Sequence, residues 1–219
     1  MPRVAVRVQA HPSRSELHGE LLRSLEPLPA ELSLHTSDPP SPWEGYKLAL
    51  ASGLEDPASH VVVLQDDATV SHNFPLAVER IAEAKPDDPV VLFLSWLPRG
   101  PAVDAMAAAR VGDCFVRFRP SKFCPVVGIL WPRAAIENFL EWSSTATLPG
   151  YPNRIHSDDA CVGEWHKRTQ STIWVSVPSL VQHHDRADST IGKTAQWGAD
   201  RNRTALIFCE GDALGYKWS

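Results

Sequence analysis

Residues 61–70, VVVLQDDATV, decide how this chain folds. The aliphatic run at 61–64 lacks the alternation of a half-exposed strand, and such a run is typical of a strand buried on both faces of a sheet. Gln65, Asp66 and Asp67 follow at once, so two adjacent carboxylates stand at the end of a buried strand. Their charges repel each other, and a positive group is needed to compensate them.

Strand and helix patterns alternate around this run. Ser13 and Glu16 have the spacing of a capping box before a helical leucine pattern, and Ser41-Pro42 followed by Glu44 predicts a second helix start. Alternating strands and helices predict an α/β protein whose sheet is parallel in its first half. We expect strands at 4–8, 32–35, 61–64, 90–95, 114–119, 125–131 and 172–177, and helices at 14–25, 43–55, 74–85, 101–110, 132–142 and 157–167.

Composition sets the class of protein. The 219 residues are 43% hydrophobic, which suits one soluble domain spanning 1–219. We expect residues 1–100 to form a nucleotide-binding half and 101–219 an acceptor and metal half. No apolar run approaches the ~20 residues of a membrane span, and the start resembles a strand rather than a signal peptide. A cytoplasmic location is therefore expected, in the host cytoplasm if a phage encodes the chain.

Charge and cysteines exclude several classes. The net charge of −5 argues against a protein coated in basic side chains for nucleic acid. A basic run at Arg110, Arg117, Arg119 and Lys122 is either a solvated face or a local binding surface. The four cysteines form no C-x-x-C pair, so buried thiols are expected rather than a zinc site.

The carboxylate pair at Asp66 and Asp67 has two interpretations. A divalent cation compensates such a pair efficiently, because oxygen ligands suit Mg²⁺ or Mn²⁺, and these ions are commonly shared with a diphosphate. The alternative is an Asp-rich turn whose carboxylates bond nearby backbone amides.

Two later stretches carry residues of the same chemistry. In 174–192, WVSVPSLVQHHDRADSTIG, a strand leads to His183 and His184, which are either Mn²⁺ ligands or ordinary histidines. In 154–168, RIHSDDACVGEWHKR, Asp158 and Asp159 occupy the first turn of an expected helix. Acids there complement the helix dipole, or one of them serves as a general base.

The ordered stretches VVVLQDDATV, SDDACVGEW and VPSLVQH resemble a GT-A-type glycosyltransferase over about residues 3–195. The family pattern is a DxD metal motif, then an acidic pair at a helix start, then a late histidine. The resemblance implies that Asp67 and His183, or His184 in the alternative register, bind the metal. It also implies that Asp66 faces the donor, and that Asp159 or Asp158 is the base.

The resemblance further implies a set of donor-binding residues. Gln65 stands where the first acid of the DxD motif is expected, which puts the ribose contact in question. The stretch QAHPSR at 9–14 stands where uracil and ribose are cradled, with Arg14 a phosphate partner. Lys47 and Lys193 are further candidates, although Lys193 also suits a solvated loop. The donor-binding set is Gln9, Ala10, His11, Arg14, Lys47, Gln65, Asp66 and Lys193.

The expected function is a glycosyltransferase that uses Mn²⁺ or Mg²⁺ and a nucleotide sugar, with UDP-sugar as the first expectation. The acceptor is a saccharide or, as in some phage enzymes, a hydroxymethylated DNA base. Trp96, Trp131 and Trp165 are candidates for stacking on it, although dispersed tryptophans more often belong to the core. The alternatives are a nucleotidyltransferase or metal-dependent hydrolase, and a non-catalytic carbohydrate- or protein-binding module derived from a transferase.

Overall fold

The computed structural model describes residues 2–38, 40–119, 121, 123–146, 157–184 and 204–218. Among these residues, seven strands form one sheet in the order β2-β1-β3-β7-β5-β8-β6. Strands β7 and β6 run against the other five, so the sheet is mixed but mostly parallel. The strands of this sheet are β1 (Val4–Ala10), β2 (Ala30–Leu34), β3 (His60–Gln65), β5 (Val90–Val91), β6 (Phe115–Arg117), β7 (Gly128–Pro132) and β8 (Trp174–Ser176).

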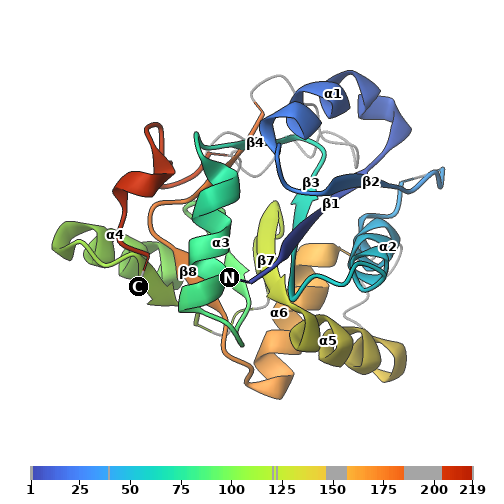
Figure 1. Ribbon diagram of the computed structural model, residues 1–219. Coiled ribbons are helices and arrows are strands. Elements are labelled where there is room, and N and C mark those ends of the chain that lie inside the picture. The colour runs from blue at the N-terminus through green and yellow to red at the C-terminus, as the bar shows by residue number, and fades with distance from the viewer. Residues whose placement is uncertain are drawn as a thin grey trace.

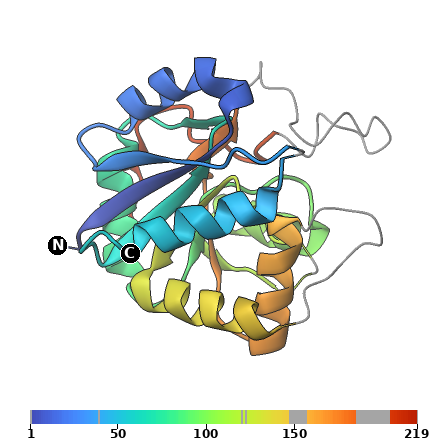
Figure 2. The same cartoon turned by 90° about the vertical axis from the view of Figure 1, so that its right-hand side faces the viewer.

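Helices cover both faces of the sheet. Helices α1 and α3 and most of the segment 204–218 pack on one face, whereas α2, α4, α5 and α6, with Leu206 and Ile207, pack on the other. Figure 1 shows α3 crossing in front of the sheet, and Figure 2 shows α2, α5 and α6 together on the opposite side. The helices are α1 (Ser15–Ser24), α2 (Pro42–Gly53), α3 (Phe74–Ala84), α4 (Arg99–Val111), α5 (Arg133–Thr145) and α6 (Asp158–Thr169), with short 3-10 turns η1 (Pro12–Arg14) and η2 (Ala213–Gly215).

Strand β3 confirms the expectation of a strand buried on both faces. Val62 and Leu64 belong to the core beneath α1 and α3, whereas Val61 and Val63 belong to the core beneath α2, α5 and α6. The expected parallel first half is also confirmed, because β1 pairs in parallel with both β2 and β3. The α/β fold class is therefore confirmed, and strands from both 1–100 and 101–219 share the one sheet.

A second, smaller sheet lies beside the end of β3. Strand β4 (Ala68–Val70) pairs antiparallel with β9 (Val181–His183), and Ala68 lies opposite His183. This pairing brings the late histidine next to the residues that follow β3. The contact is tertiary, because more than a hundred residues separate the two strands along the chain.

Several local predictions have mixed outcomes. The Ser41 cap is confirmed, since its Oγ accepts a hydrogen bond from the backbone N–H of Glu44 at 3.4 Å. The capping box at Ser13 is wrong, because Ser13 lies inside η1, whose N-cap is His11. The strand expected at 90–95 is shorter, with only Val90–Val91 paired as β5, although the residues up to 95 are buried.

The aromatic and cysteine predictions are resolved by burial. Trp131 and Trp165 pack against each other in the core, which rules them out as acceptor platforms, whereas Trp96 is 44% exposed. All four cysteines are buried thiols, as expected. No helix within the described ranges has the length and apolar character needed to cross a membrane.

Candidate functional site

The carboxyl ends of β1 and β3 open into one pocket of about 230 Å³. Parallel neighbouring strands end at the same edge of a sheet, and ligands of α/β proteins bind outside such ends. Two further segments reach this edge, the first turn of α6 and the end of β9. The pocket lining is Gln9, Ala10, His11, Arg14, His35, Pro40, Ser41, Pro42, Gly45, Gln65, Asp66, Asp67, Ser157, Asp158, Asp159 and His183.

Most sequence-predicted site residues meet in this pocket. They are Gln9, Ala10, His11, Arg14, Gln65, Asp66, Asp67, Asp158, Asp159 and His183. Two others, Lys47 and His184, do not line it. Lys47 lies on α2, paired with Glu44 at 2.8 Å. His184 lines a separate hollow beside α1, which favours His183 in the register left open by the sequence. Lys193 falls outside the described residues.

Arg14 compensates the two adjacent carboxylates. Its Nη1 lies 2.7 Å from Asp66 Oδ1 and 3.1 Å from Asp67 Oδ2. Asp66 Oδ2 also accepts a hydrogen bond from the His11 backbone N–H at 2.8 Å and lies 3.6 Å from His18 Nε2. Both carboxylates are 4% exposed, so the guanidinium acts at low dielectric, where its charge counts most. Arg14, the last residue of η1, is therefore the positive group that offsets the repulsion between the Asp66 and Asp67 carboxylates.

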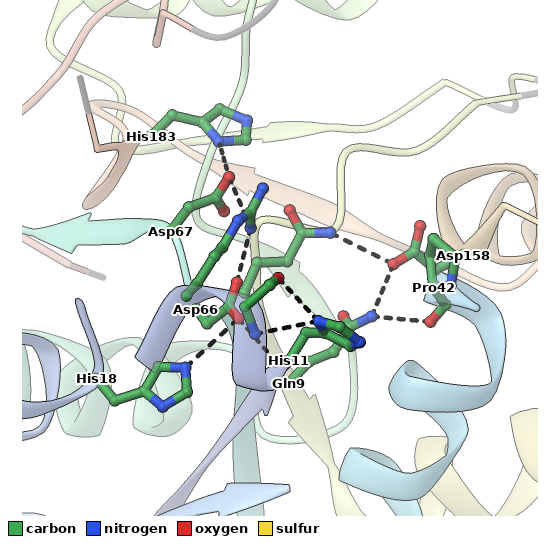
Figure 3. Close-up of polar contacts among 11 residues, drawn as sticks. Gln9, His11, His18, Pro42, Asp66, Asp67, Asp158 and His183 are labelled. Carbon is green, nitrogen blue, oxygen red and sulfur yellow. Dashed lines mark hydrogen bonds and ion pairs between the residues drawn. The ribbon is translucent and has the colours of Figure 1, made fainter. Parts of the chain in front are cut away.

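Asp67 and His183 face each other, as Figure 3 shows. His183 Nδ1 lies 3.4 Å from Asp67 Oδ2, and the His184 backbone N–H donates to the Asp67 carbonyl at 2.6 Å. A carboxylate oxygen and an imidazole nitrogen suit Mn²⁺. Within the described ranges, no three His, Cys, Asp or Glu side chains gather into a ready-made cation site.

The donor set therefore fits a divalent cation in part. The described residues offer two ligands here, Asp67 and His183, and Mg²⁺ or Mn²⁺ commonly completes its shell with water and substrate phosphates. Arg14 contacts the same Asp67 oxygen that would ligate the ion, so a cation and the guanidinium compete for it. A metal bound through Asp67 Oδ2 would require Arg14 to release that oxygen.

Asp158 and Asp159 begin α6, and Figure 3 shows Asp158 across the pocket from Asp67. Asp158 Oδ2 accepts hydrogen bonds from the side-chain amides of Gln9 and Gln65, each at 3.3 Å. Asp159 Oδ1 accepts one from the Val126 backbone N–H at 3.0 Å. Burial raises the pKa of both carboxyls, and the nearby Asp158 charge raises the pKa of Asp159 further.

The pocket contains residues that the sequence reasoning missed. His35 directly follows β2, and Pro40, Ser41, Pro42 and Gly45 lie at the start of α2 or just before it. The signal was present, because Ser41-Pro42 was identified as a helix start that follows a strand end. Gly45 permits close packing, since a Cβ there would lie 3.3 Å from Gln9 Nε2. Gln9 Oε1 is buried and has no hydrogen-bond partner among the described residues, so a ligand donor would satisfy it.

The basic run lies elsewhere. Arg117 and Arg119 line a hollow of about 550 Å³ together with the carboxyl end of α6. Arg119 is paired with Asp104 at 2.7 Å and is 68% exposed, which agrees with a solvated face. Lys122 falls outside the described residues.

Comparison with known proteins adds no family. A scan against family descriptions and a search of curated proteins both returned no match. The fold and the pocket together define the class: an α/β protein with a mostly parallel sheet and an acidic, histidine-containing pocket at the carboxyl ends of its strands.

Proposed function

We propose that this protein is a glycosyltransferase of GT-A type that binds a nucleotide sugar, with UDP-sugar as the first candidate, in the pocket at the ends of β1 and β3. One observation carries the proposal. Ten site residues predicted from four separate stretches line a single pocket. A coincidental resemblance between motifs would give no reason for these stretches to converge.

The two sides of the pocket suit the two ends of such a reaction. Asp67 and His183 would hold Mn²⁺ or Mg²⁺, and a cation there neutralises charge on the departing diphosphate. Arg14, once it leaves Asp67, is close enough to the same region to meet the phosphates. The acid pair at the start of α6 would take the proton of the acceptor hydroxyl.

The side of the pocket that would bind the nucleotide sugar combines hydrogen-bond acceptors with hydrogen-bond donors. Gln9 Oε1 is an acceptor without a partner among the described residues, and a nucleobase or ribose offers matching donors. His11 and His35 line the same side and provide faces for a base. Trp96 remains the exposed candidate for an acceptor saccharide or hydroxymethylated base.

Calorimetric titration of the protein with UDP, with and without MnCl₂, tests the proposal. We expect Mn²⁺-dependent binding in the wild type and its loss in Asp67→Asn. Arg119→Ala is the matched control, because that side chain is exposed and lies in another hollow. If UDP and other nucleoside diphosphates do not bind with Mn²⁺, the proposal fails.

Product analysis separates the remaining functions. A glycosyltransferase incubated with its donor releases a nucleoside diphosphate, whereas a nucleotidyltransferase releases pyrophosphate. A non-catalytic binding module releases neither. The observation that favours a binding module is Arg14, whose guanidinium compensates both carboxylates without a cation. Slow Mn²⁺-dependent release of UDP into water would exclude that module.

A further inference from the structure

Two glutamines converge on one oxygen of Asp158. Gln9 and Gln65 are direct register partners on the parallel strands β1 and β3. The side-chain nitrogen of each lies 3.3 Å from Asp158 Oδ2, and Gln9 Nε2 also donates to the Pro42 carbonyl at 2.8 Å. The sheet register and the start of α2 thus aim two amide donors at a single point (Figure 3).

This arrangement suits a charged Asp158. An oxygen that faces two N–H donors must accept, and an ionised carboxylate only accepts. Asp158 Oδ1 accepts a third hydrogen bond, from the Asp159 backbone N–H at 2.9 Å. Asp159 by contrast accepts a single side-chain hydrogen bond among the described residues, from Val126. The two neighbouring carboxyls therefore have unequal environments.

We propose that Asp158 stays ionised in the clamp formed by Gln9 and Gln65, and that Asp159 is the group that takes the acceptor proton. Gln65 is then a positioning residue rather than a ligand of the donor. This inference rests on the proposed function for its catalytic half. The sequence assigned the role of general base to the pair Asp158 and Asp159, and the inference gives the two residues different roles.

The charges around the pair support this division. Burial raises the pKa of Tyr46, of Cys124 and, to about 12, of Cys161, so these neighbours on α2, before β7 and on α6 are neutral at physiological pH. Glu44 and Lys47 of α2 form an ion pair with each other. The Asp158 carboxylate is therefore the adjacent charge that acts on Asp159. The other charged or titratable groups lining the pocket are His11, Arg14, His35, Asp66, Asp67 and His183.

The raised pKa of Asp159 suits a general base. A base is most effective when its pKa lies near the working pH, and pairs of carboxyls in unequal environments reach that condition. Desolvation and the Asp158 charge act on Asp159 in the same direction. The same argument explains Gln65, because an acid at this position would face Asp158 Oδ2, where the amide nitrogen now lies at 3.3 Å.

The first experiment measures charge in the metal-free protein. Carboxyl carbon-13 NMR on aspartate-labelled protein is followed over pH in the wild type, Asp158→Asn, Asp159→Asn and Gln65→Glu. We expect Asp159 to titrate at the higher pH, and its pKa to fall by about one unit or more in Asp158→Asn. Gln65→Glu should raise the pKa values with which the Asp158–Asp159 pair titrates. If Asp158 is the member that titrates at the higher pH, the proposal is overturned.

The second experiment measures the reaction. UDP release from the most active UDP-sugar of a panel is followed with Mn²⁺ over pH. Asp159→Asn should lower the rate by about 10²-fold or more at every pH, whereas Asp158→Asn should move the acidic limb of the pH–rate profile to lower pH. The reverse pattern would overturn the assignment. Absence of UDP binding by the wild type in calorimetry would overturn the proposed function instead, while the NMR titration still decides which carboxyl is charged.

Discussion

Replacing Arg14 by methionine tests how the carboxylates at the end of β3 are tolerated. Methionine keeps most of the aliphatic volume and removes the charge. The Arg14 side chain is 12% exposed, and its Nη1 lies 2.7 Å from Asp66 Oδ1 and 3.1 Å from Asp67 Oδ2. Removing one partner of a buried ion pair costs about 3–5 kcal/mol, because the other charge stays buried. At roughly 2–4 °C per kcal/mol for a chain of this size, Tm should fall by about 6–20 °C.

Manganese should partly reverse this loss. With the guanidinium gone, a cation no longer competes for Asp67 Oδ2, so the variant should bind Mn²⁺ more tightly than the wild type. A ligand at 100 times its Kd stabilises a protein by about 2.7 kcal/mol. Thermal unfolding of both proteins over a MnCl₂ series should therefore show a larger rise in Tm for the Arg14→Met variant.

Arg119→Ala is the control for this prediction. That arginine also pairs with an aspartate at 2.7 Å, but its side chain is 68% exposed, and surface pairs contribute about 0–1 kcal/mol. Its Tm should stay close to that of the wild type. An Arg14→Met protein as stable as the control would refute the argument that Arg14 holds the carboxylates. Equal Mn²⁺ shifts in Arg14→Met and the wild type would refute competition for the same oxygen.

Three further predictions address packing, pH and the donor side. Gly128→Ala should lower the free energy of unfolding in urea by about 1–3 kcal/mol, because the new Cβ would lie 2.8 Å from Val181 Cγ2. Gly100→Ala is the control and should not lower it, because the nearest atom to a Cβ there is 4.0 Å away. Equal stability of the two variants would contradict this prediction. Burial lowers the pKa of His166, so on acidification the unfolded chain binds a proton at this site before the folded protein does, and the unfolding free energy should decrease as pH drops below about 6.5. His166→Gln should flatten this dependence of the unfolding free energy on pH. An unchanged slope in the variant would count against the prediction. Lys47→Ala should leave UDP affinity unchanged by calorimetry, because Lys47 pairs with Glu44 outside the pocket, and a tenfold loss would place it in the site after all.

Local sequence patterns predicted the elements of the fold well where burial is uniform. The run at 61–64 became the fully buried β3, and Ser41-Pro42 begins α2 as expected. The pattern failed where a tertiary contact redirected the chain. Ser13 does not cap α1, because the backbone turns at His11, whose N–H donates a hydrogen bond to Asp66, the residue after β3 and 55 positions away in the sequence.

The residue types at the site were readable from the chain, because carboxylates, histidines and glutamines stand out at strand and helix ends. Their partners were not readable. Arg14 reaches Asp66 across 52 residues, and Gln65 reaches Asp158 across 93. Local residue spacing carries no information on such contacts, since periodicity reports only which face of an element is buried. Which positive group neutralises Asp66 and Asp67, and which carboxyl of the α6 pair keeps its charge, are decided by the sheet register and by the helices that close over it.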